Sequence, residues 1–152
     1  MPLETQATVA LQLVLATLFS MLIGIDRERG KHPAGVRTHM LVGLGSCLFT
    51  VLSIYAFPED STTRVAANIV VGIGFLGAGT IIKDDNGVKN LTTAASIWAT
   101  AAVGMAVGAG AWFLALVAVL LIWFILVLMQ RVEIRSAKHR RSKSAPESPE
   151  GI

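Results

Sequence analysis

The sequence predicts an all-α, polytopic transmembrane helix bundle with about five spans, and three observations support this fold class. Hydrophobic residues make up 53% of the 152 residues and charged residues only 15%, whereas soluble domains carry about 25% charged residues. The charged residues gather between long apolar runs. In lipid a helix satisfies its own backbone hydrogen bonds, which an open-edged strand cannot do. We therefore expect one membrane domain over residues 1–130 and a tail over residues 131–152.

Each apolar run has about the length that crosses a bilayer as a helix, roughly 20 residues. The five expected spans are residues 7–25, 40–57, 65–82, 92–108 and 112–129. The first run is preceded by Glu4 and by no Lys or Arg, so it lacks the positive start of a cleaved signal peptide and should remain as an anchor. The tail is basic from Arg131 onward, and its last nine residues have too few apolar side chains to fold, so we expect them to be disordered.

The basic residues predict the orientation of the bundle. With five spans, twelve of the thirteen Lys and Arg residues fall on one side of the membrane, and only Arg64 falls on the other. A four-span topology would divide these basic clusters between the two sides. The positive-inside rule then places the N-terminus outside and the C-terminus in the cytoplasm. The basic part of the tail should attract anionic lipid head groups, at about 1 kcal/mol per Lys or Arg near the surface.

Residues 70–82, VVGIGFLGAGTII, contain four glycines, namely Gly72, Gly74, Gly77 and Gly79. The first three spell GxGxxG, the fingerprint of a dinucleotide-binding βαβ unit. That fingerprint needs an acidic residue about 20 positions further along, and residues 91–97 contain none. A soluble nucleotide-binding domain is therefore excluded. Two interpretations remain: neighbouring helices press closely on both sides of this span, which we favour, or the span breaks here, as at the binding sites of some transporters.

The fourth span carries small or hydroxyl residues at every fourth position: Thr92, Ser96, Thr100, Gly104 and Gly108. This spacing places them on one helix face, where small side chains let another backbone approach. A second stripe of small residues, Ala94, Ala102, Ala106 and Gly110, lies elsewhere on the same span. We therefore expect this span to be central and contacted on several sides, and we favour close packing over the lining of a permeation path.

The polar stretches offer little evidence of a chemical site. Asp26, Glu28, Asp84 and Asp85 lie in two loops on the same predicted side. They are weak candidates for a Mg²⁺ site, since Mg²⁺ takes one or two carboxylates plus waters, but nothing in their spacing forces them together. His32 and His39 do not have zinc-ligand spacing, and no His lies near Ser96 or Thr100 in the sequence. We therefore expect no enzyme, no cofactor and, with a net charge of only +3, no nucleic-acid partner.

Three blocks of sequence resemble the MgtC/SapB family: residues 24–46 (GIDRERGKHPAGVRTHMLVGLGS), 64–82 (RVAANIVVGIGFLGAGTII) and 91–110 (LTTAASIWATAAVGMAVGAG). The resemblance implies a multi-pass protein of the bacterial inner membrane, in the short form that lacks the soluble C-terminal domain of many relatives. The family-motif residues that it carries over are Glu28, Gly35, Arg37, Thr38, Arg64, Gly72, Gly74, Gly77, Gly79, Thr92, Thr93 and Trp98. The chain departs from the family pattern at Asp26, where relatives often have a neutral or small residue.

The resemblance also implies a role in adaptation to low magnesium and, in pathogens, in survival inside macrophages. It leaves two functions open: a non-catalytic adaptor that binds other membrane proteins, which could include the proton-translocating ATP synthase, or a transporter or channel for Mg²⁺ or another small ion. No predicted span interior contains Asp, Glu, Lys or Arg, and such residues usually mark an ion path. The sequence therefore favours the adaptor, with the lipid bilayer and other membrane proteins as partners and a homodimer as a further option.

Overall fold

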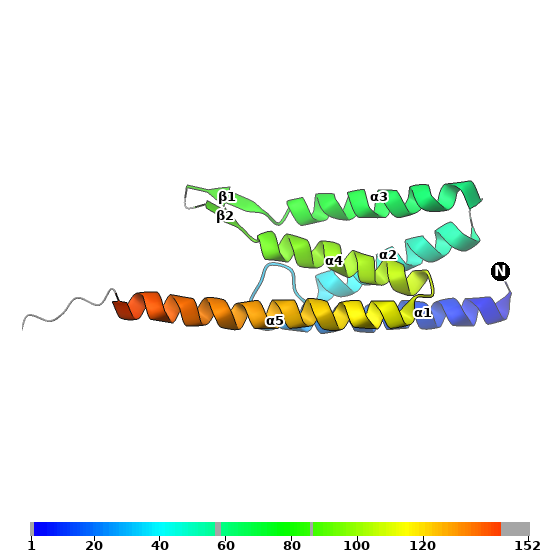
Figure 1. Ribbon diagram of the computed structural model, residues 1–152. Coiled ribbons are helices and arrows are strands. Elements are labelled where there is room, and N and C mark those ends of the chain that lie inside the picture. Colours follow the sequence, from blue (N-terminus) through cyan, green and yellow to red (C-terminus); the bar gives the residue numbers. More distant parts are fainter. Residues whose placement is uncertain (1, 57–58, 86, 144–152) are drawn as a thin grey trace, which may run out of the picture.

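The residues that the structure describes form five helices and one short hairpin (Figure 1). The computed structural model describes residues 2–56, 59–85 and 87–143, and their side chains up to Leu128 except at residues 59–62. In chain order the elements are α1 (Leu3–Arg29), α2 (Val36–Tyr55), α3 (Glu59–Ala78), β1 (Ile82–Asp84), β2 (Gly87–Lys89), α4 (Leu91–Gly108) and α5 (Trp112–Lys143). The helical fold class agrees with the prediction, apart from the two three-residue strands.

The helices run up and down, and α4 lies at their centre. It packs against α1, α2, α3 and α5, as its two stripes of small residues predict. The α1–α2 connection, the β1–β2 hairpin and the end of α5 lie at one end of the bundle, and the N-terminus lies at the other (Figure 1). The core contains small and branched side chains from four helices, among them Ala16, Cys47, Val103 and Val119.

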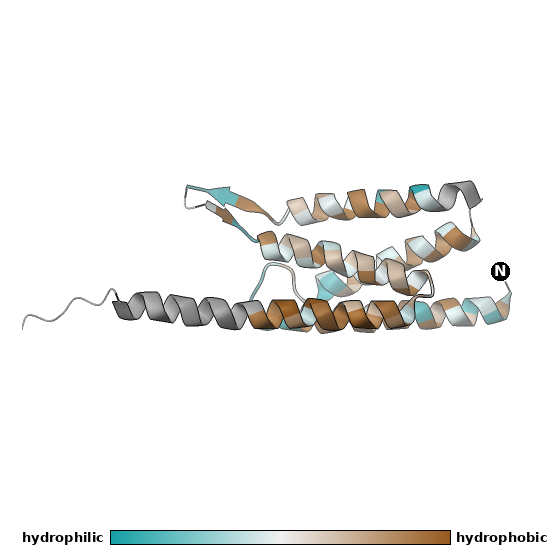
Figure 2. Ribbon diagram, in the orientation of Figure 1, coloured by the Kyte–Doolittle hydropathy of each residue, from teal (hydrophilic) through white to brown (hydrophobic). Residues whose placement is uncertain are grey.

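Helices α1, α2 and α4 are each long and apolar enough to cross a membrane. The apolar parts of the other two helices that the structure describes are shorter, Thr63–Ala78 and Trp112–Leu128. Large apolar side chains cover the outside of the bundle, including Phe75 and Phe113, which are 81% and 80% exposed. Figure 2 shows the same apolar character along the first half of α5. A surface of this kind fits lipid rather than water.

Several predicted helix ends need correction. The third span was expected to reach Ile82, but α3 ends at Ala78, where the Thr80 hydroxyl donates to the Gly77 carbonyl oxygen at 2.8 Å. Ile82 instead begins the hairpin, whose base is joined by a 3.0 Å bond from the Asn90 amide to the Thr80 carbonyl. Helix α3 is continuous, so it has no break at its glycines.

The other ends differ by a few residues, with one larger exception. Helix α1 continues to Arg29 instead of ending at Ile25, and α2 begins at Val36 and ends at Tyr55 instead of covering residues 40–57. Helix α5 continues through Lys143, so the basic part of the predicted tail is helical. The disorder predicted for residues 144–152 lies outside the described residues.

Candidate functional site

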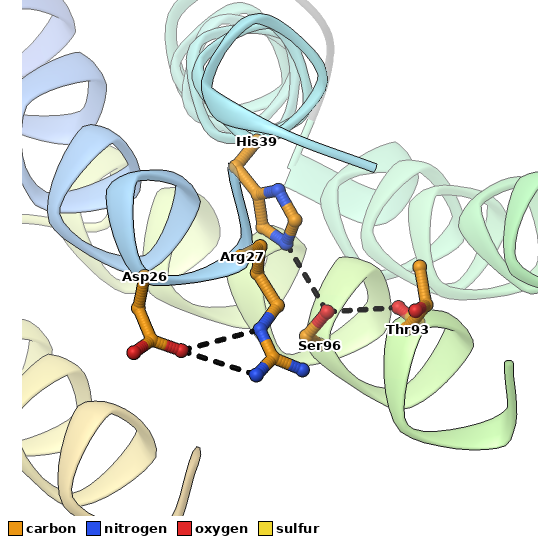
Figure 3. A network of polar contacts seen from close by, with 5 residues as sticks. All are labelled: Asp26, Arg27, His39, Thr93 and Ser96. Atoms are coloured by element: carbon orange, nitrogen blue, oxygen red, sulfur yellow. Dashed lines mark hydrogen bonds and ion pairs between the residues drawn. The ribbon is translucent and has the colours of Figure 1, made fainter. Parts of the chain in front are cut away.

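Five polar residues meet where α1, α2 and α4 converge, close to the end of the bundle that carries the hairpin. We call this group the polar junction; it consists of Asp26, Arg27, His39, Thr93 and Ser96 (Figure 3). Arg27, His39, Thr93 and Ser96 are all at least 97% buried. The three helices contribute residues far apart in the sequence, so the junction depends on their packing.

Arg27 is the largest fully buried side chain among the described residues, with 1% of its surface exposed. Its Nη2 and Nε atoms donate to Asp26 Oδ2 at 3.1 and 3.3 Å. Its Nη1 atom has no hydrogen-bond partner in the part of the chain that the structure describes. Figure 3 shows the guanidinium group between the Asp26 carboxylate and Ser96. The predicted first span ends at Ile25 and contains no ionisable side chain, but α1 extends past that residue and carries Arg27 into the bundle.

The end of α1 positions this arginine. Lys31 has a left-handed backbone with φ of 55°, its N–H donates to the Glu28 carbonyl oxygen at 3.0 Å, and the His32 N–H donates to the Arg27 carbonyl oxygen at 3.0 Å. These two bonds form a Schellman motif, which ends a helix by satisfying its last carbonyls. Lysine occupies the position that glycine usually takes in this motif.

Glu28 caps the next helix. Its Oε2 atom accepts a 2.8 Å bond from the Val36 N–H, the first residue of α2. A carboxylate is favourable at this position because a helix N-terminus carries unsatisfied donors and partial positive charge. A Cβ atom at Gly35 would lie 2.7 Å from the same Oε2 atom, so only glycine fits there without displacing Glu28.

His39 joins α2 to α4. Its Nδ1 atom lies 2.9 Å from the Gly35 carbonyl oxygen and its Nε2 atom 3.1 Å from Ser96 Oγ. Because a carbonyl oxygen only accepts, Nδ1 carries a proton. Ser96 Oγ also lies 2.8 Å from the Thr93 carbonyl oxygen, so its single proton can go to either neighbour. The nearest His is far from Ser96 in the sequence, but the fold brings His39 beside it, and Ser96 is only 3% exposed.

Glycines bring the three helices into backbone contact beside the polar junction. A Cβ atom at Gly104 of α4 would lie 2.3 Å from the Gly43 carbonyl oxygen, and one at Gly108 would lie 2.7 Å from the Cys47 carbonyl oxygen. A Cβ atom at Gly43 would lie 1.7 Å from Ser20 Oγ of α1. Ser96, Thr100, Gly104 and Gly108 are thus on the buried face of α4, whereas Thr92 is exposed.

The glycines of α3 are in a different environment. A Cβ atom at Gly72 or Gly74 would meet nothing within 4 Å, and Gly79 lies beyond the helix end. Only Gly77 approaches another helix, where a Cβ atom would lie 3.3 Å from the Ala94 carbonyl oxygen. The favoured interpretation, close packing on both sides of this span, is therefore wrong within the described chain.

The four candidate metal ligands have other contacts. Asp26 pairs with Arg27, Glu28 caps α2, and Asp84 forms an ion pair with Lys89 across the hairpin. Asp85 is exposed. Over the described residues, no three or more His, Cys, Asp or Glu side chains come together in a group that could hold a metal ion. The remaining motif residues Arg37, Thr38, Arg64 and Trp98 are exposed, and Thr93 is buried in the polar junction.

An apolar groove of about 500 Å³ lies outside the junction, between α2 and α3. Its only polar lining residues are Ser46 and Asn68. Ser46 Oγ is buried and has no hydrogen-bond partner among the described residues. The groove therefore differs from the polar junction in both chemistry and position.

Residues 13–135 of the chain match the MgtC family. Protein MgtC of Salmonella choleraesuis is 40% identical over 141 residues, which cover 93% of this chain and 58% of the relative. Protein MgtC of Brucella abortus is 50% identical over 95 residues, 62% of this chain and 40% of the relative. YhiD of Escherichia coli, whose name proposes it as a magnesium transporter, is 42% identical over 108 residues, 66% of this chain and 50% of the relative. The chain thus spans about half the length of these relatives. No solved structure gives a significant match.

Proposed function

The chain belongs to the MgtC family, and we propose that it is a non-catalytic adaptor that supports adaptation to low magnesium by binding other proteins of the bacterial inner membrane. The family match and the three long apolar helices make it a multi-pass inner-membrane protein. The proposed magnesium role is supported by the name of YhiD, of which this chain covers 50%. The choice of adaptor over transporter rests on the polar junction.

The charge of the polar junction is the observation that carries the proposal. An ionisable side chain inside a membrane bundle usually marks an ion path, and here that side chain is Arg27. Its positive charge is balanced by one carboxylate, Asp26. A path for Mg²⁺ needs excess negative charge or a ring of oxygen ligands to replace the hydration shell of the ion. A buried arginine paired with one carboxylate offers neither, so the junction suits the joining of helices better than the passage of a cation.

The packing around the junction supports the same conclusion. Gly104 and Gly108 bring the backbone of α4 into contact with that of α2, which leaves no space for water between these helices. His39 and Thr100, which face this contact, have 0% exposure. The large groove between α2 and α3 is almost entirely apolar. A permeating ion needs polar groups that it can reach, and the polar groups between α2 and α4 are closed to it.

We also propose that all five helices cross the membrane, with the N-terminus outside and the C-terminus in the cytoplasm. The up-and-down order of the helices in Figure 1 supports an odd number of crossings. The end of the bundle with the hairpin carries Arg29, Lys31, Arg37, Lys83 and Lys89, whereas Arg64 belongs to the start of α3 near the opposite end. This distribution supports a cytoplasmic location for the hairpin.

The second candidate function is magnesium transport, and the name of YhiD is the observation that favours it. Under this alternative, Asp84 and Asp85 on the exposed hairpin would attract the cation at the entrance. Lys89 already neutralises Asp84, so this attraction would be weak. Transport by the purified protein alone separates the two functions.

The adaptor proposal can be tested by growth in low magnesium. Arg37 is an exposed residue of the family motif, at the end of the bundle that carries the hairpin. Arg37→Gln should therefore abolish support of growth in low magnesium while the protein still accumulates in the membrane at the parent level. Arg29→Gln, the same change at an exposed residue on the other side of the α1–α2 connection, is the matched control and should retain growth. Normal growth of the Arg37→Gln strain would argue against an adaptor surface at this end.

A further inference from the structure

The outward face of α3 carries a polar side chain that the described chain leaves without a partner. Asn68 is exposed and lines the groove between α2 and α3. Its amide makes no hydrogen bond within the described residues. The groove wall opposite contains Ser46, whose buried hydroxyl also lacks a partner there. Two polar groups without partners therefore belong to one apolar groove.

The depth of these groups limits what can occupy the groove. Asn68 lies halfway along α3 and Ser46 halfway along α2, so each is about 15 Å from the ends of its helix at 1.5 Å per residue. If α3 crosses the bilayer, as proposed above, both groups lie near the bilayer centre. Phospholipid head groups remain at the surface, and acyl chains offer no hydrogen bonds. The side chain of another transmembrane helix can supply hydrogen bonds at this depth.

The same face of α3 has the shape of a helix contact. At 100° per residue, Gly72 and Phe75 lie within about 40° of Asn68 around the helix. A Cβ atom at Gly72 would meet nothing within 4 Å, so another helix can approach there. Phe75 is 81% exposed, the highest exposure among the large apolar side chains of α3. Gly45 on the facing wall is also open, which leaves room for a large side chain in the groove.

We propose that α3 forms the interface of a homodimer, in which α3 of each copy lies along the α2–α3 groove of the other. An asparagine amide is both donor and acceptor, so two copies related by a two-fold axis can exchange hydrogen bonds between Asn68 of one copy and Asn68 of the partner subunit. Phe75 of each copy then fills the groove of the other. A two-fold contact uses the same surface patch on both subunits. This patch contains both the α2–α3 groove and Phe75, the side chain that would fill the groove of the other copy.

Cross-linking in native membranes tests this proposal. In a Cys47→Ala background, Gly72→Cys should give a disulfide-linked dimer on mild oxidation, because a bridge requires Cα atoms about 4.4–6.8 Å apart. Leu121→Cys is the matched control, since Leu121 is 57% exposed on α5, away from the groove, and should remain monomeric. Equal cross-linking at both positions, or none at Gly72→Cys, would overturn the proposal. Labelling of Gly72→Cys by a membrane-impermeant maleimide would overturn it as well, because α3 would then lie outside the bilayer.

A mass measurement in mild detergent provides a second, independent readout. The parent should have the mass of a dimer, and Asn68→Leu should raise the dissociation constant about five- to thirty-fold, the effect of losing interhelical hydrogen bonds worth about 1–2 kcal/mol. Leu121→Val should leave the dissociation constant unchanged. A monomeric parent, whether its groove holds lipid or the helix of another protein, would contradict the proposal. The adaptor function is tested separately, by growth in low magnesium and by ion flux. If those tests reject the adaptor, the cross-linking and mass measurements still decide whether the dimer forms.

Discussion

Replacing Gly104 with alanine should destabilise the bundle, because the added methyl group has no space. Its Cβ atom would lie 2.3 Å from the carbonyl oxygen of Gly43 and 3.0 Å from the carbonyl carbon. Ordinary contact begins near 3.4 Å, so α2 and α4 would have to separate by about 1 Å. Both atoms belong to the backbone of a packed helix and cannot rotate away as a flexible side chain would.

The size of the effect follows from two opposing contributions. Alanine is favoured over glycine in a helix interior by about 1 kcal/mol. Overpacking of a tight interior costs about 1–3 kcal/mol, and separating the helices would also stretch the 3.1 Å contact between His39 and Ser96. We therefore expect a net loss of about 1–2 kcal/mol of stability for Gly104→Ala and a larger loss for Gly104→Leu.

Thermal unfolding in detergent, followed by circular dichroism, measures this loss. Gly74→Ala is the matched control: it is the same change, in α3, at a position outside the groove where a Cβ atom would meet nothing within 4 Å. This variant should be as stable as the parent or up to about 1 kcal/mol more stable. If Gly104→Ala and Gly74→Ala unfold at the same temperature, the backbone contact between α2 and α4 is not as close as described.

Three further predictions concern the polar junction and the topology. Arg27→Met should destabilise the protein by about 3–5 kcal/mol, because it leaves the Asp26 carboxylate unpaired. Adding Asp26→Asn to this variant should restore part of the lost unfolding temperature. If the double variant unfolds at the same temperature as Arg27→Met alone, the ion pair is contradicted. In a double-mutant cycle on thermal stability, His39→Ala and Ser96→Ala should couple by about 0.5–1.5 kcal/mol, whereas additive losses would mean that the 3.1 Å contact contributes nothing. With Cys47 replaced by Ala, a reporter cysteine at Asp60 should react with an impermeant maleimide in intact cells and one at Lys143 only after permeabilisation; the reverse pattern would invert the proposed orientation.

The helices and the central position of α4 could be predicted because they depend on local patterns. The four-residue repeat from Ser96 to Gly108 predicts one packed face in any helix, and the structure places that face against α2. The hairpin was missed because Ile82 continues an apolar run, and three-residue strands leave almost no pattern of their own. A Cβ atom at Gly72 or Gly74 of α3 would meet nothing within 4 Å and only Gly77 approaches another helix, so glycine alone did not indicate where a helix is contacted.

The polar junction could be predicted only in part. Arg27 was interpreted as a loop charge because the apolar run ends at Ile25, yet Ala16, Ser20, Ile23 and Arg27 follow one another at spacings of three and four. That spacing continues the buried face of α1 and could have identified the arginine. The contact between His39 and Ser96 joins residues 57 positions apart. It arises only when α2 and α4 pack together, and no spacing within either helix predicts it.

Magnesium flux into liposomes that contain only the purified protein tests the adaptor proposal most directly. The buried Arg27 is neutralised by one carboxylate and closed off by tightly packed helices, so the parent should give no flux above that of empty vesicles. A vesicle preparation with a known magnesium channel confirms that the assay responds. Clear flux from the parent that is lost when Asp84→Asn and Asp85→Asn are combined would contradict the adaptor and establish a transporter.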